Sequence, residues 1–205
     1  PITGALTVEK TGQVPTDTEE GTDANGNKLV TPLYELKGLP GAEYALIATE
    51  DIVYPDGYTG TLFAAGDTVL DRYQELKATT LKNYTLEVPV GELVDVSEYI
   101  GKVPDEDATR EEISGFYRQN KNNVQRSLLD GTAVHYVLRT NEEGKLQITG
   151  LPLGEYKIVE VKAPNGYYRD QMDCTREVSL LEPEESGRPE EVVTAKTAFE
   201  NAKQE

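Results

Sequence analysis

Short segments of alternating apolar and polar residues, separated by turns rich in glycine and proline, constrain the fold most strongly. Near the N-terminus, Leu6, Val8 and Lys10 alternate with Thr7 and Glu9, which is the period-two pattern of a half-buried strand. Short strands joined by such turns predict a β-sandwich. The polar stretch 12–27 is expected to be a loop, and the similar sequence runs are 33–36, 44–47, 136–138, 146–148, 156–161 and 192–201.

Residues 72–131 interrupt this pattern. Thr109 is followed three residues later by Glu112, which is a capping-box signature, and apolar residues then recur roughly on one helical face. We therefore expect one helix over about 109–128. The segment also contains strand-like runs at 79–90 and 93–96.

The charge balance excludes two classes of partner. The 205 residues include 20 Lys and Arg against 37 Asp and Glu, so the formal net charge is −17. Nucleic acids and anionic membranes both attract basic surfaces, so neither is an expected partner of this segment. We find no metal-ligand cluster, cofactor motif or Ser/His/Asp order, so we expect no cofactor, no metal and no enzyme with turnover.

The chain has one cysteine, Cys174, and one histidine, His135. An internal disulfide is therefore impossible, and a catalytic Cys/His pair is disfavoured because nothing in the sequence brings the two residues together. No apolar run is long enough to span a bilayer, and no signal peptide is recognisable. We read the chain as a segment of a longer protein.

Lys10, Glu160 and Asn201 each end an apolar series on one face of an expected strand. Each could simply mark the point where its strand leaves the core. The register of Glu160 is also ambiguous, because Val159 and Val161 make the opposite face apolar. If all three point inward, however, an amine, a carboxyl and a carboxamide meet inside the sandwich. The three apolar series are Leu6 and Val8; Tyr156 and Ile158; and Val193, Ala195, Thr197 and Phe199.

Burial of these groups would favour a reaction between them. It would lower the pKa of Lys10 and raise that of Glu160, because both charged forms lose hydration. A neutral Lys10 amine is a nucleophile, and a protonated Glu160 could polarise the Asn201 carbonyl oxygen and pass a proton to the leaving group. The product would be an amide between Lys10 and Asn201, with release of ammonia.

Residues 156–167, with the sequence Tyr-Lys-Ile-Val-Glu-Val-Lys-Ala-Pro-Asn-Gly-Tyr, resemble the E-box of Cna B-type domains. These are the SpaA-like, prealbumin-like modules of Gram-positive pilins and adhesins. Residues 4–11 resemble the first strand of that family, and residues 199–201 resemble its last. The resemblance covers about 4–71 and 132–201. It implies an Ig-like sandwich with an autocatalytic isopeptide bond.

By motif position, the resemblance makes Lys10 the amine donor, Asn201 the acceptor and Glu160 the catalyst. Because donor and acceptor lie near opposite chain ends, we expect a mostly β, Ig-like or prealbumin-like sandwich spanning residues 1–205, with a large α+β insertion at about 72–131. Bond formation would be a single-turnover event, so the module is not an enzyme.

The resemblance also implies a function and a location. The chain is expected to be a structural or adhesive module of a Gram-positive surface protein or pilin, extracellular and attached to the cell wall. Its expected partners are neighbouring domains of the same protein. The alternative is an adhesin module that recognises a host protein or glycan through residues 72–131.

Overall fold

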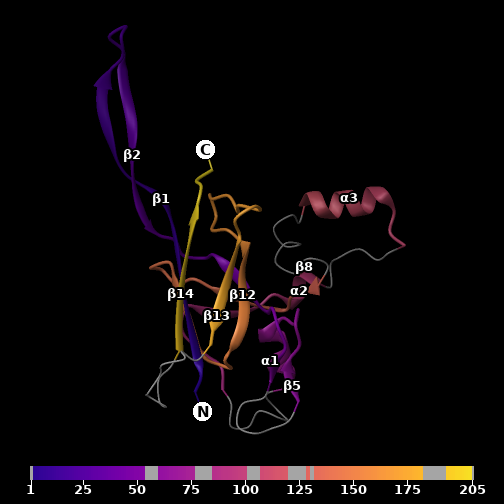
Figure 1. Cartoon of the computed structure of the whole chain (residues 1–205). Coiled ribbons are helices and arrows are strands. Elements are labelled where there is room, and N and C mark those ends of the chain that lie inside the picture. Colours follow the sequence, from indigo (N-terminus) through magenta and orange to yellow (C-terminus); the bar gives the residue numbers. More distant parts are fainter. Residues whose placement is uncertain are drawn as a thin grey trace.

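The computed structural model is a β-sandwich made of two five-stranded sheets (Figure 1). The first sheet has the order β14-β1-β11-β6, and β2 pairs with the distal part of β1; the second has the order β13-β12-β3-β10-β7. The mostly β, prealbumin-like class expected from the sequence is confirmed. The structure describes residues 2–53, 60–76, 85–100, 107–119, 128–129, 132–181 and 193–204.

The first sheet places the first and last strands of the chain side by side. Strands β1 and β14 run parallel, whereas β11 runs antiparallel to β1 on its other edge. A parallel pair needs a long connection, and here nearly the whole domain lies between the two strands. The strands of this sheet are β1 (Gly4–Thr22), β2 (Lys28–Gly38), β6 (Glu87–Val90), β11 (Lys145–Leu151) and β14 (Val193–Asn201).

The second sheet is antiparallel throughout; β3 is its central strand, and β12 lies between β13 and β3. Its strands are β3 (Glu43–Ala48), β7 (Glu92–Asp95), β10 (Tyr136–Arg139), β12 (Gly154–Lys162) and β13 (Thr175–Leu180). Two small two-stranded sheets accompany it, formed by β4 (Ile52–Val53) with β5 (Thr61–Phe63) and by β8 (Leu128–Leu129) with β9 (Thr132–Ala133).

The main core fills the space between the two sheets, where Leu6 and Val8 of β1 meet Tyr156 and Ile158 of β12. A second, smaller cluster buries Val161. This cluster explains why the β12 sequence is apolar on both faces. Because Val161 faces the small cluster, the neighbouring Glu160 faces the main core. The other buried members of the small cluster are Ala45, Val96, Val134 and Val137.

The stretch 12–27 is not a loop, contrary to expectation. Strand β1 continues to Thr22, and β2 begins at Lys28, so the two form a long ribbon that projects from the sandwich (Figure 1). The turn is confined to 23–27, where Asp23 Oδ1 accepts hydrogen bonds from the backbone N–H groups of Asn25 (2.8 Å) and Asn27 (2.9 Å). The ribbon is exposed on both faces, so its sequence lacks the apolar alternation that marks half-buried strands.

In the part of the chain that the structure describes, three helices lie outside the sheets: α1 (Val69–Leu76), α2 (Ser97–Ile100) and α3 (Arg110–Gln119). The capping box is confirmed, because the Glu112 N–H donates to Thr109 Oγ1 and the Thr109 N–H donates to Glu112 Oε2, each at 3.2 Å. The expected helix over 109–128 was too long. Helix α3 ends at Gln119, Leu128 lies in β8, and residues 120–127 fall outside the described ranges.

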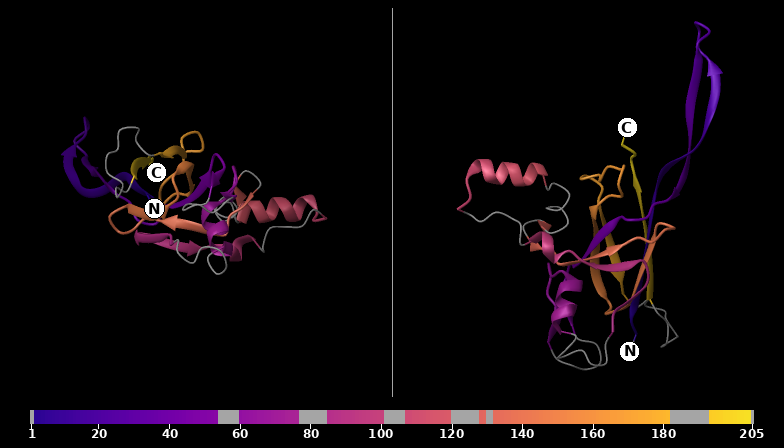
Figure 2. Two further views of the ribbon diagram at one scale, coloured as in Figure 1. Left: turned by 60° about the horizontal axis from the view of Figure 1, so that its bottom comes forward. Right: turned by 180° about the vertical axis from the view of Figure 1, so that it is seen from behind.

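The segment 72–131 is partly built into the sandwich. Strand β6 pairs with β11 in the first sheet, and β7 pairs with β10 in the second. The expected strand over 79–90 is present at Glu87–Val90, while 77–84 lie outside the described residues. Helix α3, in contrast, stands away from both sheets (Figures 1 and 2). The division into one domain with an insertion at 72–131 stays a prediction.

Candidate functional site

Lys10, Glu160 and Asn201 lie together in the interior, with residue exposures of 1%, 1% and 4%. In the parallel pairing of β1 with β14, Lys10 is opposite Phe199 and Gly12 is opposite Asn201. Lys10 and Asn201 therefore share the inward face of the first sheet, as the period-two pattern predicted. Glu160 reaches them from β12 in the opposite sheet.

The carboxylate of Glu160 bridges the other two side chains. Its Oε2 forms an ion pair with Lys10 Nζ, and its Oε1 accepts a hydrogen bond from Asn201 Nδ2 at 3.0 Å. One carboxylate thus contacts both the amine and the amide nitrogen. This differs from the expected arrangement, in which Glu160 would bond to the Asn201 carbonyl oxygen.

The backbone at Lys10 is fixed by two neighbouring turns. The Lys10 N–H donates to Gly144 O at 2.7 Å, and Lys10 O accepts from the Leu39 N–H at 2.9 Å. Gly144 has a φ of 76°, and a Cβ there would lie 2.5 Å from Lys10 O. The turn can approach β1 this closely only because position 144 is glycine.

Aromatic rings separate the site from water. Lys10 Nζ lies 5.5 Å from the centroid of the Phe199 ring, and the Tyr44 ring lies 5.0 Å from it. Arg176 stacks on the same Phe199 ring at 4.4 Å. Electrostatic interactions in this cluster are therefore stronger than they would be in water.

Burial lowers the pKa of Lys10 from its ordinary value, because the ammonium form loses its hydration. The negative charge of Glu160 opposes this effect, and the positive charge of Arg176 adds to it. The net effect is a lowered pKa of Lys10, so this lysine loses its proton and becomes a neutral, nucleophilic amine more readily than a lysine on the protein surface.

Four buried polar atoms of this cluster lack a hydrogen bond of ordinary geometry with any described residue, and two of them, Lys10 Nζ and Glu160 Oε2, form the ion pair with each other. Asn201 Oδ1 and the Tyr44 hydroxyl are buried, and neither forms a hydrogen bond of ordinary geometry with any residue that the structure describes. Tyr44 lies directly opposite Glu160 in the pairing of β3 with β12. The sequence did not single out Tyr44, because β3 is buried on both faces and shows no alternation that would assign its inward residues.

Cys174 and His135 do not meet. The sulfur of Cys174 lies 3.3 Å from a guanidinium nitrogen of Arg169. His135 Nδ1 instead lies 3.0 Å from Asp71 Oδ2, and the same carboxylate accepts the backbone N–H groups of His135 and Tyr136 at 2.9 Å each. Asp71 therefore ties α1 to the start of β10, and the geometry offers no Cys/His catalytic pair.

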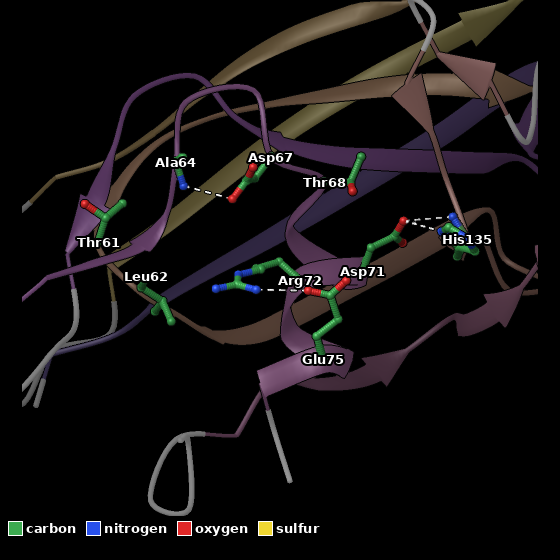
Figure 3. A pocket seen from close by; sticks show the side chains of 9 residues that line it. All are labelled: Thr61, Leu62, Ala64, Asp67, Thr68, Asp71, Arg72, Glu75 and His135. Atoms are coloured by element: carbon green, nitrogen blue, oxygen red, sulfur yellow. Dashed lines mark hydrogen bonds and ion pairs between the residues drawn. The ribbon is translucent and has the colours of Figure 1, made fainter. Parts of the chain in front are cut away.

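His135 lines an open cavity of about 490 Å³ beside α1, which is shown in Figure 3. Its polar side chains are largely engaged with one another: Arg72 pairs with Glu75 at 3.0 Å, and Asp67 accepts the Ala64 N–H at 2.9 Å. The cavity thus presents no converging set of free polar groups. The remaining lining residues are Thr61, Leu62, Thr68 and Asp71.

Within the described ranges, no group of three or more His, Cys, Asp or Glu side chains is arranged to hold a metal ion. The helices in these ranges are too short and too polar to cross a membrane.

Comparison with known families supports the resemblance seen in the sequence. The model of the SpaA prealbumin-like fold domain matches residues 109–188, which include β12 and the E-box-like stretch but leave β1 and β14 outside. The sequence resemblance instead pointed to 4–71 and 132–201. A search of curated proteins found no match.

Several solved pilin structures are similar to the chain. The minor pilin GBS52 of Streptococcus agalactiae is 15% identical, with a TM-score of 0.39 over 100% of this chain and 46% of that one. The major pilin SpaD of Corynebacterium diphtheriae is 15% identical, with a TM-score of 0.36 over 98% and 30%. The pilus backbone protein RrgB of Streptococcus pneumoniae is 14% identical, with a TM-score of 0.33 over 98% and 41%.

The chain thus spans less than half the length of these pilins. Because their scores and identities are low, the fold assignment rests on the two sheets and on the family match. The chain is a prealbumin-like β-sandwich that matches the SpaA family over residues 109–188, and the resemblance first seen in residues 156–167 is confirmed.

Proposed function

We propose that the chain is a structural module of a Gram-positive surface protein or pilin, locked by an intramolecular amide bond between Lys10 and Asn201. One observation carries this proposal: an amine, a carboxylate and a carboxamide from β1, β12 and β14 are buried in mutual contact. Two buried charges are costly to maintain, and a reaction that consumes them stabilises the folded chain.

Glu160 is placed to move both protons that the reaction requires. It first accepts a proton from the Lys10 ammonium, which leaves a neutral amine and a neutral acid. The amine attacks Cγ of Asn201 to give a tetrahedral intermediate. Glu160 then donates its proton to Nδ2 and accepts the remaining excess proton from Nζ. The bond from Cγ to Nδ2 breaks, ammonia leaves, and an uncharged amide faces a neutral acid.

The fold supplies the rate by holding the reactants together. Lys10 and Asn201 lie on adjacent strands, and the backbone of Lys10 is fixed by hydrogen bonds to Gly144 and Leu39. Because the amine and the carboxamide are already held together, they need not find each other by diffusion, and this raises the rate of amide formation by several orders of magnitude. The bond forms once per chain, so the module is not an enzyme with turnover.

The position of the bond suits a load-bearing role. The chain termini lie at opposite ends of the sandwich (Figure 1), so tension applied through them shears β1 against β14. A covalent link from Lys10 to Asn201 would carry that tension between the two strands. The proposed location is extracellular, at the cell wall, with neighbouring domains of the same surface protein as partners.

The proposal is tested by replacing Glu160 with alanine and following bond formation by intact mass. The wild-type chain, synthesised in a cell-free reaction and quenched in acidic denaturant at intervals, should lose one ammonia. Glu160→Ala should slow this loss by a factor of about 100 or more, because general acid–base catalysis typically contributes that much. Equal rates for the two chains would remove Glu160 from the mechanism.

An adhesive role for residues 72–131 is a separate proposal, supported by the projection of α3 from the sandwich (Figure 2). Deleting the whole segment would be a poor test, because it removes β6 and β7 from the main sheets. Replacing α3 alone with a Gly/Ser linker of equal length is cleaner. A host-binding module should then lose binding on arrays of extracellular matrix proteins and glycans, and unchanged binding would contradict the proposal.

A further inference from the structure

The proposed reaction requires a hydrogen-bond donor at the Asn201 carbonyl oxygen that Glu160 does not provide. As the amine attacks, negative charge develops on Oδ1, and a donor aimed at this atom stabilises the transition state. The carboxylate of Glu160 faces the amide nitrogen and the amine instead. Among the described residues, Oδ1 is buried without a hydrogen-bond partner.

The hydroxyl of Tyr44 is a donor in the same cluster; it interacts with the nearby Glu160 carboxylate but forms no hydrogen bond of ordinary geometry with any described residue. Tyr44 is fully buried on β3, its ring contacts Phe199, and its backbone lies opposite Glu160. Burial raises the pKa of Tyr44 well above its ordinary value, and the nearby charge of Glu160 raises it further. The hydroxyl therefore keeps its proton and can act only as a donor toward a developing anion.

We propose that the Tyr44 hydroxyl donates a hydrogen bond to Asn201 Oδ1 during amide formation and serves as the oxyanion donor of the site. This role rests on the proposed function above. It gives the hydroxyl a role at a position where a phenylalanine would fill the same volume and avoid the cost of burying a hydroxyl without a hydrogen bond of ordinary geometry. It also assigns a hydrogen-bond partner to Asn201 Oδ1 and to the Tyr44 hydroxyl.

The test compares Tyr44→Phe with Tyr156→Phe in the cell-free mass assay. Both tyrosines are fully buried in the main core, and both changes remove one oxygen while keeping the ring. Tyr156 differs in that its hydroxyl donates to Pro152 O at 2.6 Å, away from Lys10. Tyr44→Phe should slow ammonia loss about 100-fold, as expected for loss of an oxyanion donor, whereas Tyr156→Phe should leave the rate within about twofold.

Thermodynamic stability provides a second readout, in which Tyr156→Phe, not Tyr44→Phe, should have the larger effect. When both changes are made in chains that also carry Asn201→Ala, which cannot form the bond, Tyr44→Phe should cost clearly less than Tyr156→Phe, because the Tyr44 hydroxyl has no hydrogen bond of ordinary geometry to lose. Tyr156→Phe should cost about 1 kcal/mol, because it leaves Pro152 O without its donor. A loss of stability in Tyr44→Phe that matches Tyr156→Phe would indicate a purely structural hydroxyl and overturn the inference.

Tyr44 could instead act only by positioning Glu160, and a double-mutant comparison separates the two roles. Glu160→Asp retains a carboxylate but draws it back from the site. If Tyr44 acts on the Asn201 oxygen, the rate effects of Tyr44→Phe and Glu160→Asp multiply; a much smaller Tyr44→Phe effect in the Glu160→Asp chain would contradict the proposal. If the wild-type chain never loses ammonia, the proposed function itself is wrong. If Glu160→Ala slows the loss of ammonia but Tyr44→Phe does not, only the proposed role of Tyr44 is wrong.

Discussion

Replacing Asn201 with alanine should lower the midpoint of thermal unfolding by about 10–20 °C. The bond from Lys10 to Asn201 would close a loop of about 190 residues, and the loss of chain entropy in the unfolded state is then worth about 5 kcal/mol. For a domain of this size, each kcal/mol shifts the midpoint by about 2–4 °C. Scanning calorimetry of the wild-type and Asn201→Ala chains measures the difference.

The control must separate the covalent bond from the hydrogen bond between Asn201 and Glu160. In a chain that carries Glu160→Ala and remains unlinked, adding Asn201→Ala should shift the midpoint by only a few degrees, because the remaining interactions of that side chain are worth about 1 kcal/mol. A large and equal shift in both backgrounds would mean that Asn201 stabilises the fold without a crosslink.

Under tension applied through its two termini, the wild-type chain should show no unfolding extension from the region between Lys10 and Asn201. The load would pass along β1 to Lys10, cross the amide and leave through Asn201, so the intervening residues are never stretched. In Asn201→Ala the same region should unravel and release about 600 Å of chain, since about 190 residues extend by about 3.3–3.6 Å each. Single-molecule pulling resolves the two behaviours.

A reducing agent provides the matched condition for this experiment. The only cysteine is Cys174, so the lock cannot be a disulfide within the chain, and the wild-type response should be the same with and without reductant. A long unfolding step in the wild-type chain would show that tension reaches the sandwich and would exclude a load-bearing crosslink.

The sequence indicated which face Lys10, Glu160 and Asn201 take better than it indicated the bounds of the elements around them. Lys10, Glu160 and Asn201 could be identified because each continues an apolar period-two series, and a polar residue in such a register is conspicuous. Tyr44 could not be identified in this way. Its strand is buried on both faces, and only the pairing with β12 shows that it stands opposite Glu160.

The first half of the ribbon, residues 12–22, was missed for the opposite reason, whereas the run 33–36 in β2 was expected to be a strand. Neither face of the ribbon is buried along most of its length, so residues 13–22 show no apolar alternation and resemble a loop. The helix expected over 109–128 was extended too far at its end, because apolar residues continue to recur at helical spacing as far as Leu128, which the structure places in β8. Strand β13 was not predicted, because Val178 and Leu180 are the only apolar residues among its six.

The most direct measurement is peptide mapping of the purified wild-type chain by mass spectrometry. We expect a single branched peptide in which the segment containing Lys10 is joined to the segment containing Asn201, with a combined mass short by one ammonia. The Glu160→Ala chain should yield the two segments separately. Recovery of both segments as unmodified linear peptides from the wild-type chain would contradict the proposed lock.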